Sequence, residues 1–383
     1  MRTLKYLLLL IMLVCFRQNF AQTWVDSLDI YAREEFMPPS KFRWNWMKAS
    51  LIHTMVKQYD NGNGIQQKMY LDYIKKAMDK RYNRANGKTP NAVASGLGMA
   101  FLLRVSKDEK YKIACQKIYD DYLKIKRTKE GGVSHLRKDI ELWDDTIFMI
   151  GQFLLEMYKA TNDEKYIDEL TNQISIHREK LLDKESGLWV HGYDADKKSH
   201  CDFCGQLNWP DKISGRSAEV WARGNGWIVV TLADALETIP TSHKNWNVLA
   251  DYLKEMIAHL PEYQNKENGH WYQLPVRFTE PKNFIESSST AMFAYAETKA
   301  IKLGLADEMI YKNSIALAYK GLRNYSIKQK SNNYISTKNV CKGTCIGDMN
   351  YYLKRKVRDE KPYSIGMFIS FGRAYESMNQ QKK

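Results

Sequence analysis

Proline is scarce in this chain, with 9 in 383 residues, and few of these prolines interrupt the apolar segments. Alternating patterns typical of β-strands are short and rare. The chain also lacks a Gly-rich phosphate-binding loop, a His-Glu-x-x-His pair, a Gly-x-Ser-x-Gly turn and an EF-hand loop. The sequence therefore offers no support for phosphate, metal or serine-nucleophile chemistry, and it favours a helical protein.

Long hydrophobic runs are missing beyond the N-terminus, so no segment is long and apolar enough to span a bilayer. Residues 1–21 combine a basic start, at Arg2 and Lys5, with an apolar run over 6–16 and a small residue at Ala21. This order is typical of a secretory signal peptide, and we expect the protein to be exported.

Acidic residues are the minority: 44 Asp and Glu stand against 58 Lys and Arg, for a formal charge of +14. The basic residues are scattered, which argues against nucleic acid as a partner. An acidic glycan would suit a basic exported protein, and simple solubility is the alternative. The 10 Trp, 24 Tyr and 13 Phe also suit sugar rings, although a large core would need them too.

Cysteine is rare, and five remain after signal removal: Cys115, Cys201, Cys204, Cys341 and Cys345. Cys115 lies in an apolar helical segment and is expected to pack as a small hydrophobe. The other four form C-x2-C and C-x3-C pairs. This spacing would suit a tetrahedral zinc site, but disulfides are at least as compatible with an oxidising compartment, and both alternatives stay open.

Apolar residues recur with a period near 3.6 in about a dozen segments. These segments lie near 24–35, 43–58, 66–81, 92–105, 109–125, 145–160, 164–181, 217–237, 244–260, 286–302, 307–325 and 361–378. A faint repeat runs through them: 101–103 leads through a loop to 108–111, as 153–155 leads to 163–166. Each copy is a helix, a short turn and an acid-capped second helix.

A dozen helices in such pairs predict an all-α fold in which six helical hairpins close into an (α/α)6 barrel. An open solenoid is the alternative. No linker or shift in composition marks a boundary, so we expect residues 22–383 to form a single domain.

Two adjacent carboxylates, Asp144 and Asp145, stand where a polar segment gives way to a strongly apolar helical one. Helix capping would explain them, because an aspartate at the N-cap accepts free backbone N–H bonds. The alternative is that one of them faces a pocket as a general acid and base.

The segment Trp221–Trp227 is the strongest further cluster. Gly224 and Gly226 lie in a run that otherwise predicts helix, and they would let a neighbour approach the backbone closely. Arg223 offers a planar fork suited to a carboxylate, and the tryptophans offer flat faces. A tightly packed helix start, with Arg223 in an internal ion pair, is the alternative.

Isolated histidines and tryptophans are weaker candidates. His191 lies between Trp189 and Tyr193, which makes a pocket wall plausible, and His135 is a similar but weaker case. Trp44 begins an early helix, where a core or rim position is the simpler interpretation.

Taken in order, the motifs resemble one family. Residues 143–149, 191–194, 221–227, 286–295 and 343–352 are similar to the unsaturated glucuronyl and rhamnogalacturonyl hydrolases of glycoside hydrolase families 88 and 105, and family 105 looks the closer. This resemblance implies an (α/α)6 barrel with a pocket at one end. It also implies removal of a 4,5-unsaturated uronic acid from oligosaccharides released by polysaccharide lyases, with no metal and no organic cofactor.

The resemblance assigns roles to individual residues. Asp145 matches the family aspartate that protonates the double bond and then acts as the base for water. Burial beside Trp143, itself a candidate substrate-binding residue, would raise the pKa of Asp145. His191, Arg223 and Trp227 match substrate-pocket positions, with Arg223 expected at the uronate carboxylate and Trp227 on the sugar ring.

Two further substrate-binding positions follow from the same resemblance. Trp44 matches a family tryptophan near the first helix. Asn91 stands where the family usually carries a second functional aspartate. Asparagine can donate and accept hydrogen bonds but cannot ionise, so any role that needs a second carboxylate is in doubt.

The expected substrate is an acidic oligosaccharide supplied by an upstream lyase, with no nucleic acid and, after signal removal, no membrane as partner. The basic charge favours unsaturated glucuronate linked to rhamnose 3-sulfate, from ulvan. Alternatives are a rhamnogalacturonyl hydrolase acting on pectin fragments, another (α/α)6 glycosidase or lyase, and a catalytically silent glycan-binding barrel. We expect a periplasmic location, because short lyase products are most useful after import.

Overall fold

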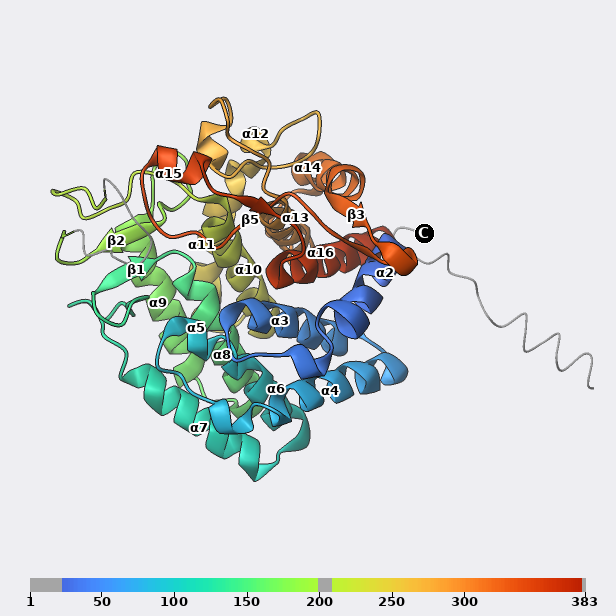
Figure 1. Ribbon diagram of the computed structural model, residues 1–383. Coiled ribbons are helices and arrows are strands. Elements are labelled where there is room, and N and C mark those ends of the chain that lie inside the picture. Colours follow the sequence, from blue (N-terminus) through green and yellow to red (C-terminus); the bar gives the residue numbers. More distant parts are fainter. Residues whose placement is uncertain (1–22, 199–208, 381–383) are drawn as a thin grey trace, which may run out of the picture.

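The computed structural model describes residues 23–198 and 209–380. Residues 1–21, the predicted signal peptide, and the pair Cys201 and Cys204 lie outside them. Long helices dominate the described residues and alternate along the chain between an inner and an outer layer (Figure 1).

Six long helices form the inner layer of the described chain, and each packs against the next. They are α3 (Trp46–Asn61), α6 (Gly96–Ser106), α8 (Thr146–Thr161), α10 (Ala222–Thr238), α13 (Ser287–Lys302) and α16 (Pro362–Gln380). The last of them, α16, packs against the first, α3, so the ring is closed. Closure decides between the barrel and the open solenoid in favour of the barrel.

Each inner helix packs against one outer helix. The outer helices, in the order of their inner partners, are α4 (Gly64–Asp79), α7 (Glu109–Leu123), α9 (Lys165–Leu181), α11 (Trp246–Ala258), α14 (Glu308–Gly321) and α2 (Trp24–Tyr31). The first helix, α2, therefore covers the last inner helix, α16. All twelve predicted segments contain the expected helix, although the segment predicted from 217 becomes helical only at Ala222, and the predicted (α/α)6 barrel is confirmed.

The turns between inner and outer helices explain the internal repeat. The helix α6 ends at Lys107 and α8 ends at Asn162, both in the left-handed conformation with φ of 56° and 55°. The next aspartate then accepts a backbone N–H: Asp108 accepts from Lys110, and Asp163 accepts from Lys165. One short motif thus reverses the chain at both places.

Inner and outer helices differ in how their surfaces are buried. In α8 the first 13 residues, 146–158, are all buried, because this helix is surrounded by protein on every side. In α9 the buried residues instead recur at three- and four-residue steps, as at Tyr166, Leu170 and Ile174. The outer helix α9 is therefore amphipathic, whereas α8 is buried on every face over these residues.

Short strands lie in the connections, and in the described residues they form three two-stranded antiparallel sheets. The pairs are β1 (Glu141–Trp143) with β2 (Gly192–Asp194), β3 (Ile327–Gln329) with β4 (Ile335–Thr337), and β5 (Val340–Cys341) with β6 (Val357–Arg358). The short helices α5 (Pro90–Val93), α12 (Leu260–Tyr263) and α15 (Met349–Leu353) also lie in connections. Of the described helices, none has the length and apolarity needed to cross a bilayer.

The inner helices all begin at the same end of the barrel. Trp46 at the start of α3 stacks on Tyr363 at the start of α16, with ring centroids 5.3 Å apart. Ser95, just before α6, donates to the carbonyl of Asn45, just before α3, at 3.3 Å. At the other end, Lys57 of α3 pairs with Asp234 of α10 at 2.7 Å. We call these the N-terminal end and the C-terminal end of the barrel.

Candidate active site

The predicted catalytic aspartate lies at the N-terminal end of the barrel, where the inner helices begin. Asp145 occupies the N-cap position of α8, but its side chain makes no capping hydrogen bond. The capping explanation for this carboxylate therefore fails. Its neighbour Asp144 has no exposed surface, whereas Asp145 keeps 8% of its surface accessible. Asp145 is thus the carboxylate that a substrate can reach.

Burial raises the pKa values of both carboxyl groups. Burial, followed by the charge of Asp145, raises the pKa of Asp144 well above its usual range; the amide of Asp145 and the charge of Arg223 oppose this more weakly. Burial also raises the pKa of Asp145, against the charges of His135 and Arg223. A carboxyl group that is still protonated near neutral pH can act as a general acid.

The first turn of α10 makes room for Asp144. A Cβ atom placed on Gly224 would lie 2.0 Å from Oδ2 of Asp144, closer than any real contact allows. Only glycine permits this approach of the α10 backbone to the aspartate. The prediction that the glycines of 221–227 admit a close neighbour is confirmed: the neighbour is Asp144 at Gly224 and Met292 at Gly226.

His191 faces the same pair from the other side. Its Nε2 lies 3.8 Å from Oδ1 of Asp144, and its Nδ1 lies 2.8 Å from the hydroxyl of Tyr352. Complete burial, together with the charges of His135 and Arg223, lowers the pKa of His191 well below its usual range. The imidazole is therefore neutral at neutral pH, and its ring packs against Trp221 at a centroid distance of 4.3 Å.

His135 connects three of the predicted site residues. It lies on the loop before β1, and its ring stacks on Trp143 with centroids 4.5 Å apart and planes 4° from parallel. Its Nε2 lies 3.2 Å from the amide nitrogen of Asn91, on α5, and its Nδ1 lies 3.4 Å from Oδ1 of Asp145. Asn91, Trp143 and Asp145 are thus brought together through a histidine that the sequence flagged only weakly.

Arg223, the second residue of α10, is clamped by the protein. Its terminal nitrogens donate to the carbonyl oxygens of Cys341 and Lys342 at 2.9 and 3.1 Å, and one of them lies 3.5 Å from Glu286. Its plane lies between the rings of Trp221 and Tyr363, 4.6 and 4.7 Å from their centroids.

The guanidinium is fully buried, and its Nε is the atom left without a hydrogen-bond partner among the described residues. The internal ion pair weighed as an alternative is therefore present. Binding of a uronate carboxylate by Arg223 stays a prediction, and in the structure this residue fixes the loop after β5 to the barrel.

The two remaining predicted residues lie at the edges of this cluster. Trp227 is completely buried one turn into α10, with its ring 4.1 Å from that of Phe148. Trp44 precedes α3, is half-buried and donates from its ring N–H to the carbonyl of Asn86 at 3.2 Å. Their contacts with substrate also stay predictions.

Sequence reasoning missed Tyr352 and underrated Glu286. Tyr352 reaches His191 across 161 positions of sequence, and no local pattern signals such a contact. Glu286 does cap α13, since it accepts the N–H of Ser289 at 2.7 Å, as its position suggested. It also accepts the N–H of Cys341 at 3.0 Å and faces Arg223.

The described cysteines differ from one another in their bonding state. Cys115 is buried in the core with a free thiol, as predicted. Cys341 is likewise free, whereas Cys345 is disulfide-bonded, so the four paired cysteines do not form two bridges or one four-thiolate zinc site. Within residues 23–198 and 209–380, no group of three or more His, Cys, Asp and Glu side chains could hold a metal ion.

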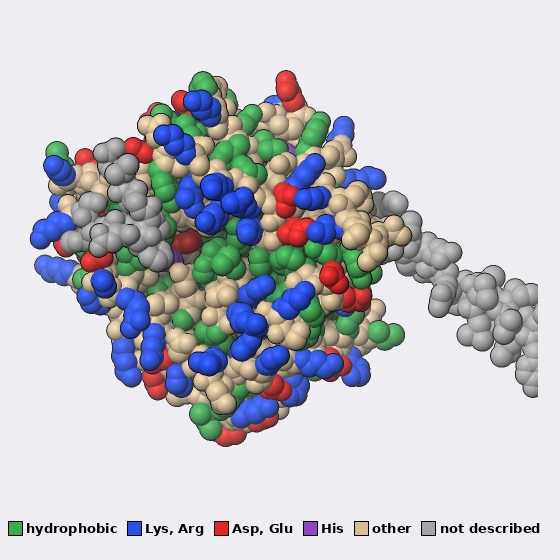
Figure 2. Space-filling view, viewed as in Figure 1, with side chains coloured by type: hydrophobic (Ala, Val, Ile, Leu, Met, Phe, Trp, Pro, Cys, Tyr) green, Lys and Arg blue, Asp and Glu red, His purple; other side chains and the backbone are tan. Residues whose placement is uncertain are grey.

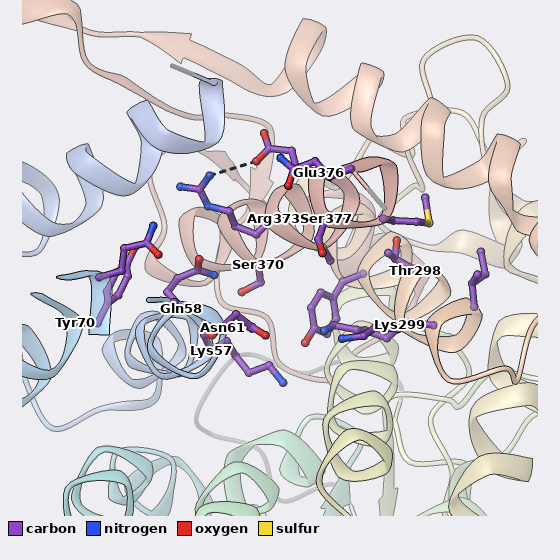
Figure 3. Close-up of a pocket in the computed structure, with 18 of the residues that line it drawn as sticks. Lys57, Gln58, Asn61, Tyr70, Thr298, Lys299, Ser370, Arg373, Glu376 and Ser377 are labelled. Carbon is purple, nitrogen blue, oxygen red and sulfur yellow. Dashed lines mark hydrogen bonds and ion pairs between the residues drawn. The ribbon is translucent and has the colours of Figure 1, made fainter. Parts of the chain in front are cut away.

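A hollow of about 630 Å³ opens at the C-terminal end of the barrel (Figure 3). Its charged lining residues are already paired: Lys57 with Asp234, Lys299 with Glu237, and Arg373 with Glu376. Paired charges stabilise a fold but do not leave an acid free to react. The candidate active site is therefore the N-terminal end, where the carboxylates lack such partners.

The fold has been seen in related proteins. The chain superposes on a family 105 glycoside hydrolase of C. acetobutylicum ATCC 824 with a TM-score of 0.81, at 25% identity, covering 93% of this chain and all of that one. An unsaturated glucuronyl hydrolase from Streptococcus agalactiae superposes with a TM-score of 0.66 at 14% identity, which supports the fold alone.

Similarity extends to curated sequences. The chain is 25% identical over 272 residues to the unsaturated rhamnogalacturonyl hydrolase YesR of Bacillus subtilis, covering 68% of this chain and 72% of that protein. It is 28% identical over 187 residues to an unsaturated 3S-rhamnoglycuronyl hydrolase of Formosa agariphila, covering 47% and 45%. The sequence model of Glycosyl Hydrolase Family 88 matches residues 17–379, and this chain, a glycosidase, belongs to that family.

Proposed function

We propose that this enzyme removes a 4,5-unsaturated uronic acid from the non-reducing end of lyase-generated oligosaccharides. The observation that carries the proposal is Asp145: it is a buried carboxyl with a raised pKa, released from helix capping and still reachable from outside. Its position at the start of an inner helix also places it where helix dipoles favour an anionic substrate.

The reaction begins with a proton. Asp145 donates its proton to C4 of the vinyl ether, and positive charge develops at C5 and the ring oxygen. Water adds at C5 and gives its proton to the Asp145 carboxylate, which restores the acid. The hemiketal then opens, C1 becomes an aldehyde and the aglycone leaves with a hydroxyl group. One water molecule is consumed, and the enzyme returns to its starting state.

The neighbouring side chains support this single acid. Asp144, next to it, holds its own proton still more firmly, because its pKa is raised well above the usual range. Neutral His191 and Tyr352 line the same side without adding positive charge. Asp145 is therefore the group that can both give up a proton and take one back during turnover.

For the aglycone we propose a sulfated sugar, as in unsaturated glucuronyl-rhamnose 3-sulfate from ulvan. Lys48 lies in the first turn of α3, and burial together with the charges of Lys41, Arg43 and Lys361 lowers its pKa. Like charges held this close are typical of a surface that receives an anion.

A second pair of basic residues, Lys342 and Lys356, lies beside the sheet of β5 and β6. The N–H of Lys342 donates to the carbonyl of Lys356 at 2.9 Å, and Arg223 holds the carbonyl of Lys342 beside the site. Figure 2 shows Lys and Arg side chains gathered over β5 and the segment after α15, and again over α3, with acidic and histidine atoms in the recess beside them. The name of the Formosa agariphila relative points in the same direction.

The alternative substrate is an unsaturated rhamnogalacturonan fragment from pectin. The observation that favours it is the match to YesR, which covers more of this chain than the match to the 3S-rhamnoglycuronyl hydrolase. A catalytically silent glycan-binding barrel is the second alternative, and the raised pKa of an uncapped Asp145 weighs against it.

We also propose that residues 1–21 direct export, that the enzyme acts in the periplasm and that a polysaccharide lyase supplies its substrate. The unsaturated bond at the non-reducing end is the product of lyase β-elimination, so a lyase must act first. Fusion of residues 1–21 to a reporter, followed by cell fractionation, tests the export proposal separately from activity.

The test of function is the ultraviolet absorbance of the conjugated double bond on lyase digests of ulvan and of rhamnogalacturonan. Loss of absorbance on the ulvan digest alone supports the sulfated substrate; loss on the rhamnogalacturonan digest alone supports the pectin alternative. No loss on either, with the fold intact, overturns the proposed activity. A desulfated ulvan digest tests whether the enzyme needs the sulfate group. Lys342→Ala tests whether that basic residue contributes to activity on the sulfated digest, and the exposed Lys68→Ala is the control.

A further inference from the structure

Asn91 lies at the head of a short chain of contacts that leads through His135 to the proposed acid. The amide nitrogen of Asn91 lies 3.2 Å from Nε2 of His135. The other ring nitrogen of His135, Nδ1, lies 2.8 Å from the hydroxyl of Thr146 and 3.4 Å from Oδ1 of Asp145. A residue that cannot ionise therefore controls the histidine that faces the acid.

The chemistry of the amide and the imidazole decides which atom donates and which accepts in these contacts. An amide nitrogen only donates, so Nε2 of His135 accepts and carries no proton. The single proton of the neutral ring is then on Nδ1, where it is donated to the hydroxyl of Thr146 at 2.8 Å, while Oδ1 of Asp145 lies 3.4 Å from the same nitrogen. The ring cannot turn away easily: it stacks on Trp143, and its own backbone N–H donates to the carbonyl of Glu141 at 2.8 Å.

A positive charge on His135 would act directly on the ionisation of Asp145. Burial lowers the pKa of His135, and the charge of Asp145 raises it less. The ionisable groups that face these two residues are Asp144, His177, His191 and Arg223. Burial lowers the pKa values of His177 and His191, so Arg223 is the cation of this group at neutral pH.

We infer that Asn91 is a positioning residue: its amide holds His135 in the neutral Nδ1–H form, so that the ring donates to Thr146 and lies beside Asp145 without bringing a positive charge to it. An aspartate at position 91 would instead accept from Nε2–H and stabilise an imidazolium between two carboxylates. That cation, 3.4 Å from Asp145, would favour loss of the catalytic proton. The role in turnover rests on the proposed function, but the protonation state of His135 does not.

The first experiment measures His135 itself. Selective ¹³C labelling of histidine, with the signal assigned through His135→Gln, follows the ring in the wild type and in Asn91→Asp. The wild-type ring is expected to titrate below the usual value of about 6.5, and the variant at least about one unit higher than the wild type. A wild-type ring that is charged at neutral pH, or a variant with an unchanged ring, overturns the inference whether or not any substrate is turned over.

The second experiment measures the alkaline limb of kcat/KM against pH, where Asp145 loses its proton. Asn91→Asp is expected to move this limb about one unit lower, because the charged ring stabilises the Asp145 carboxylate. In the double variant Asn91→Asp, His135→Gln the same new carboxylate has no imidazolium between it and Asp145. Repulsion between the carboxylates is then expected to move the limb higher than in His135→Gln alone.

Opposite shifts in the two backgrounds assign the effect to His135, and shifts of the same sign contradict the inference. Asn83→Asp, exposed on the same connection, adds the same charge at the surface and is the matched control. Its profile is expected to match the wild type within about 0.2 units, because exposed charges are screened.

Discussion

The two ends of this barrel hold buried aspartates in opposite states. At the C-terminal end, Asp234 accepts hydrogen bonds from Lys57 and Tyr295 on one oxygen, at 2.7 and 2.8 Å, and from His53 and Gln152 on the other, at 2.7 and 3.2 Å. Burial acts against its charge, but Lys57 and His53 outweigh burial and lower its pKa.

At the N-terminal end the same residue type lacks these partners. Neither oxygen of Asp144 has a partner in hydrogen-bonding geometry among the described residues, and the same holds for Oδ1 of Asp145. Burial therefore dominates and raises both pKa values. The comparison teaches that depth of burial does not identify a catalytic carboxylate; the supply of cationic partners does.

Removing the proposed acid is expected to have the largest effect. Asp145→Asn should lower kcat by about a thousandfold or more on the substrate digest, because it removes both the proton donor and the base. Its melting temperature should equal or exceed that of the wild type. A carboxyl whose folded pKa is raised loses stability as pH rises, so the gap in melting temperature should grow with pH.

Asp234→Asn, the matched variant at the C-terminal end, should instead lower stability and leave activity unchanged. Asp234→Asn leaves Lys57 without its buried partner and is expected to cost about 3 kcal/mol of unfolding free energy, with kcat per folded molecule retained. The folded pKa of Asp234 is lowered, so its stabilisation is present above the unfolded value of about 3.9 and fades as pH falls below it. Denaturant unfolding at several pH values measures this; unchanged stability would break the comparison.

Crowding Asp144 is expected to have an intermediate effect. Gly224→Ala would push a Cβ atom against the carboxylate, and a loss of about 10- to 100-fold in kcat/KM is expected if the pair must keep its present geometry. Gly64→Ala, at a helical glycine with nothing within 4 Å of the added Cβ, is the control and should retain full activity. Equal activity in both variants would show that the approach of α10 to Asp144 has no role in turnover.

The barrel could be predicted from the sequence because its information is local. Helical periodicity and the repeated turn before Asp108 and Asp163 specify the hairpins, and the number of hairpins limits how they can close. Asp145 was also predictable, through its place at the boundary between a polar and an apolar segment and through the resemblance to known hydrolases. Its freedom from helix capping was not, because a sequence does not say which oxygen a free N–H finds.

The remaining contacts depend on how distant segments meet. His135 faces Asp145 across ten positions of sequence, but only the stacking on Trp143 and the amide of Asn91 fix the direction of its ring. Arg223 looked like a substrate clamp because its planar fork suits a carboxylate; the carbonyls that occupy it come from the loop after β5, more than a hundred residues away. These contacts join residues that are far apart in the sequence, so only the folded structure of the barrel shows them.

Two buried tyrosines are expected to give the smallest effects, because each contacts one side chain, His191 or Asp234, through a single hydroxyl group. Tyr352 lies 2.8 Å from Nδ1 of His191, and Tyr295 donates to Asp234 at 2.8 Å. Losing one hydrogen bond costs about 1 kcal/mol, or a few-fold in an equilibrium or a rate. Tyr352→Phe should therefore lower kcat/KM a few-fold with little change in stability, and Tyr295→Phe should lower stability by about 1 kcal/mol with kcat/KM unchanged. If both variants lose stability and neither loses activity, His191 is a structural residue and the N-terminal end differs from the C-terminal end only in its aspartates.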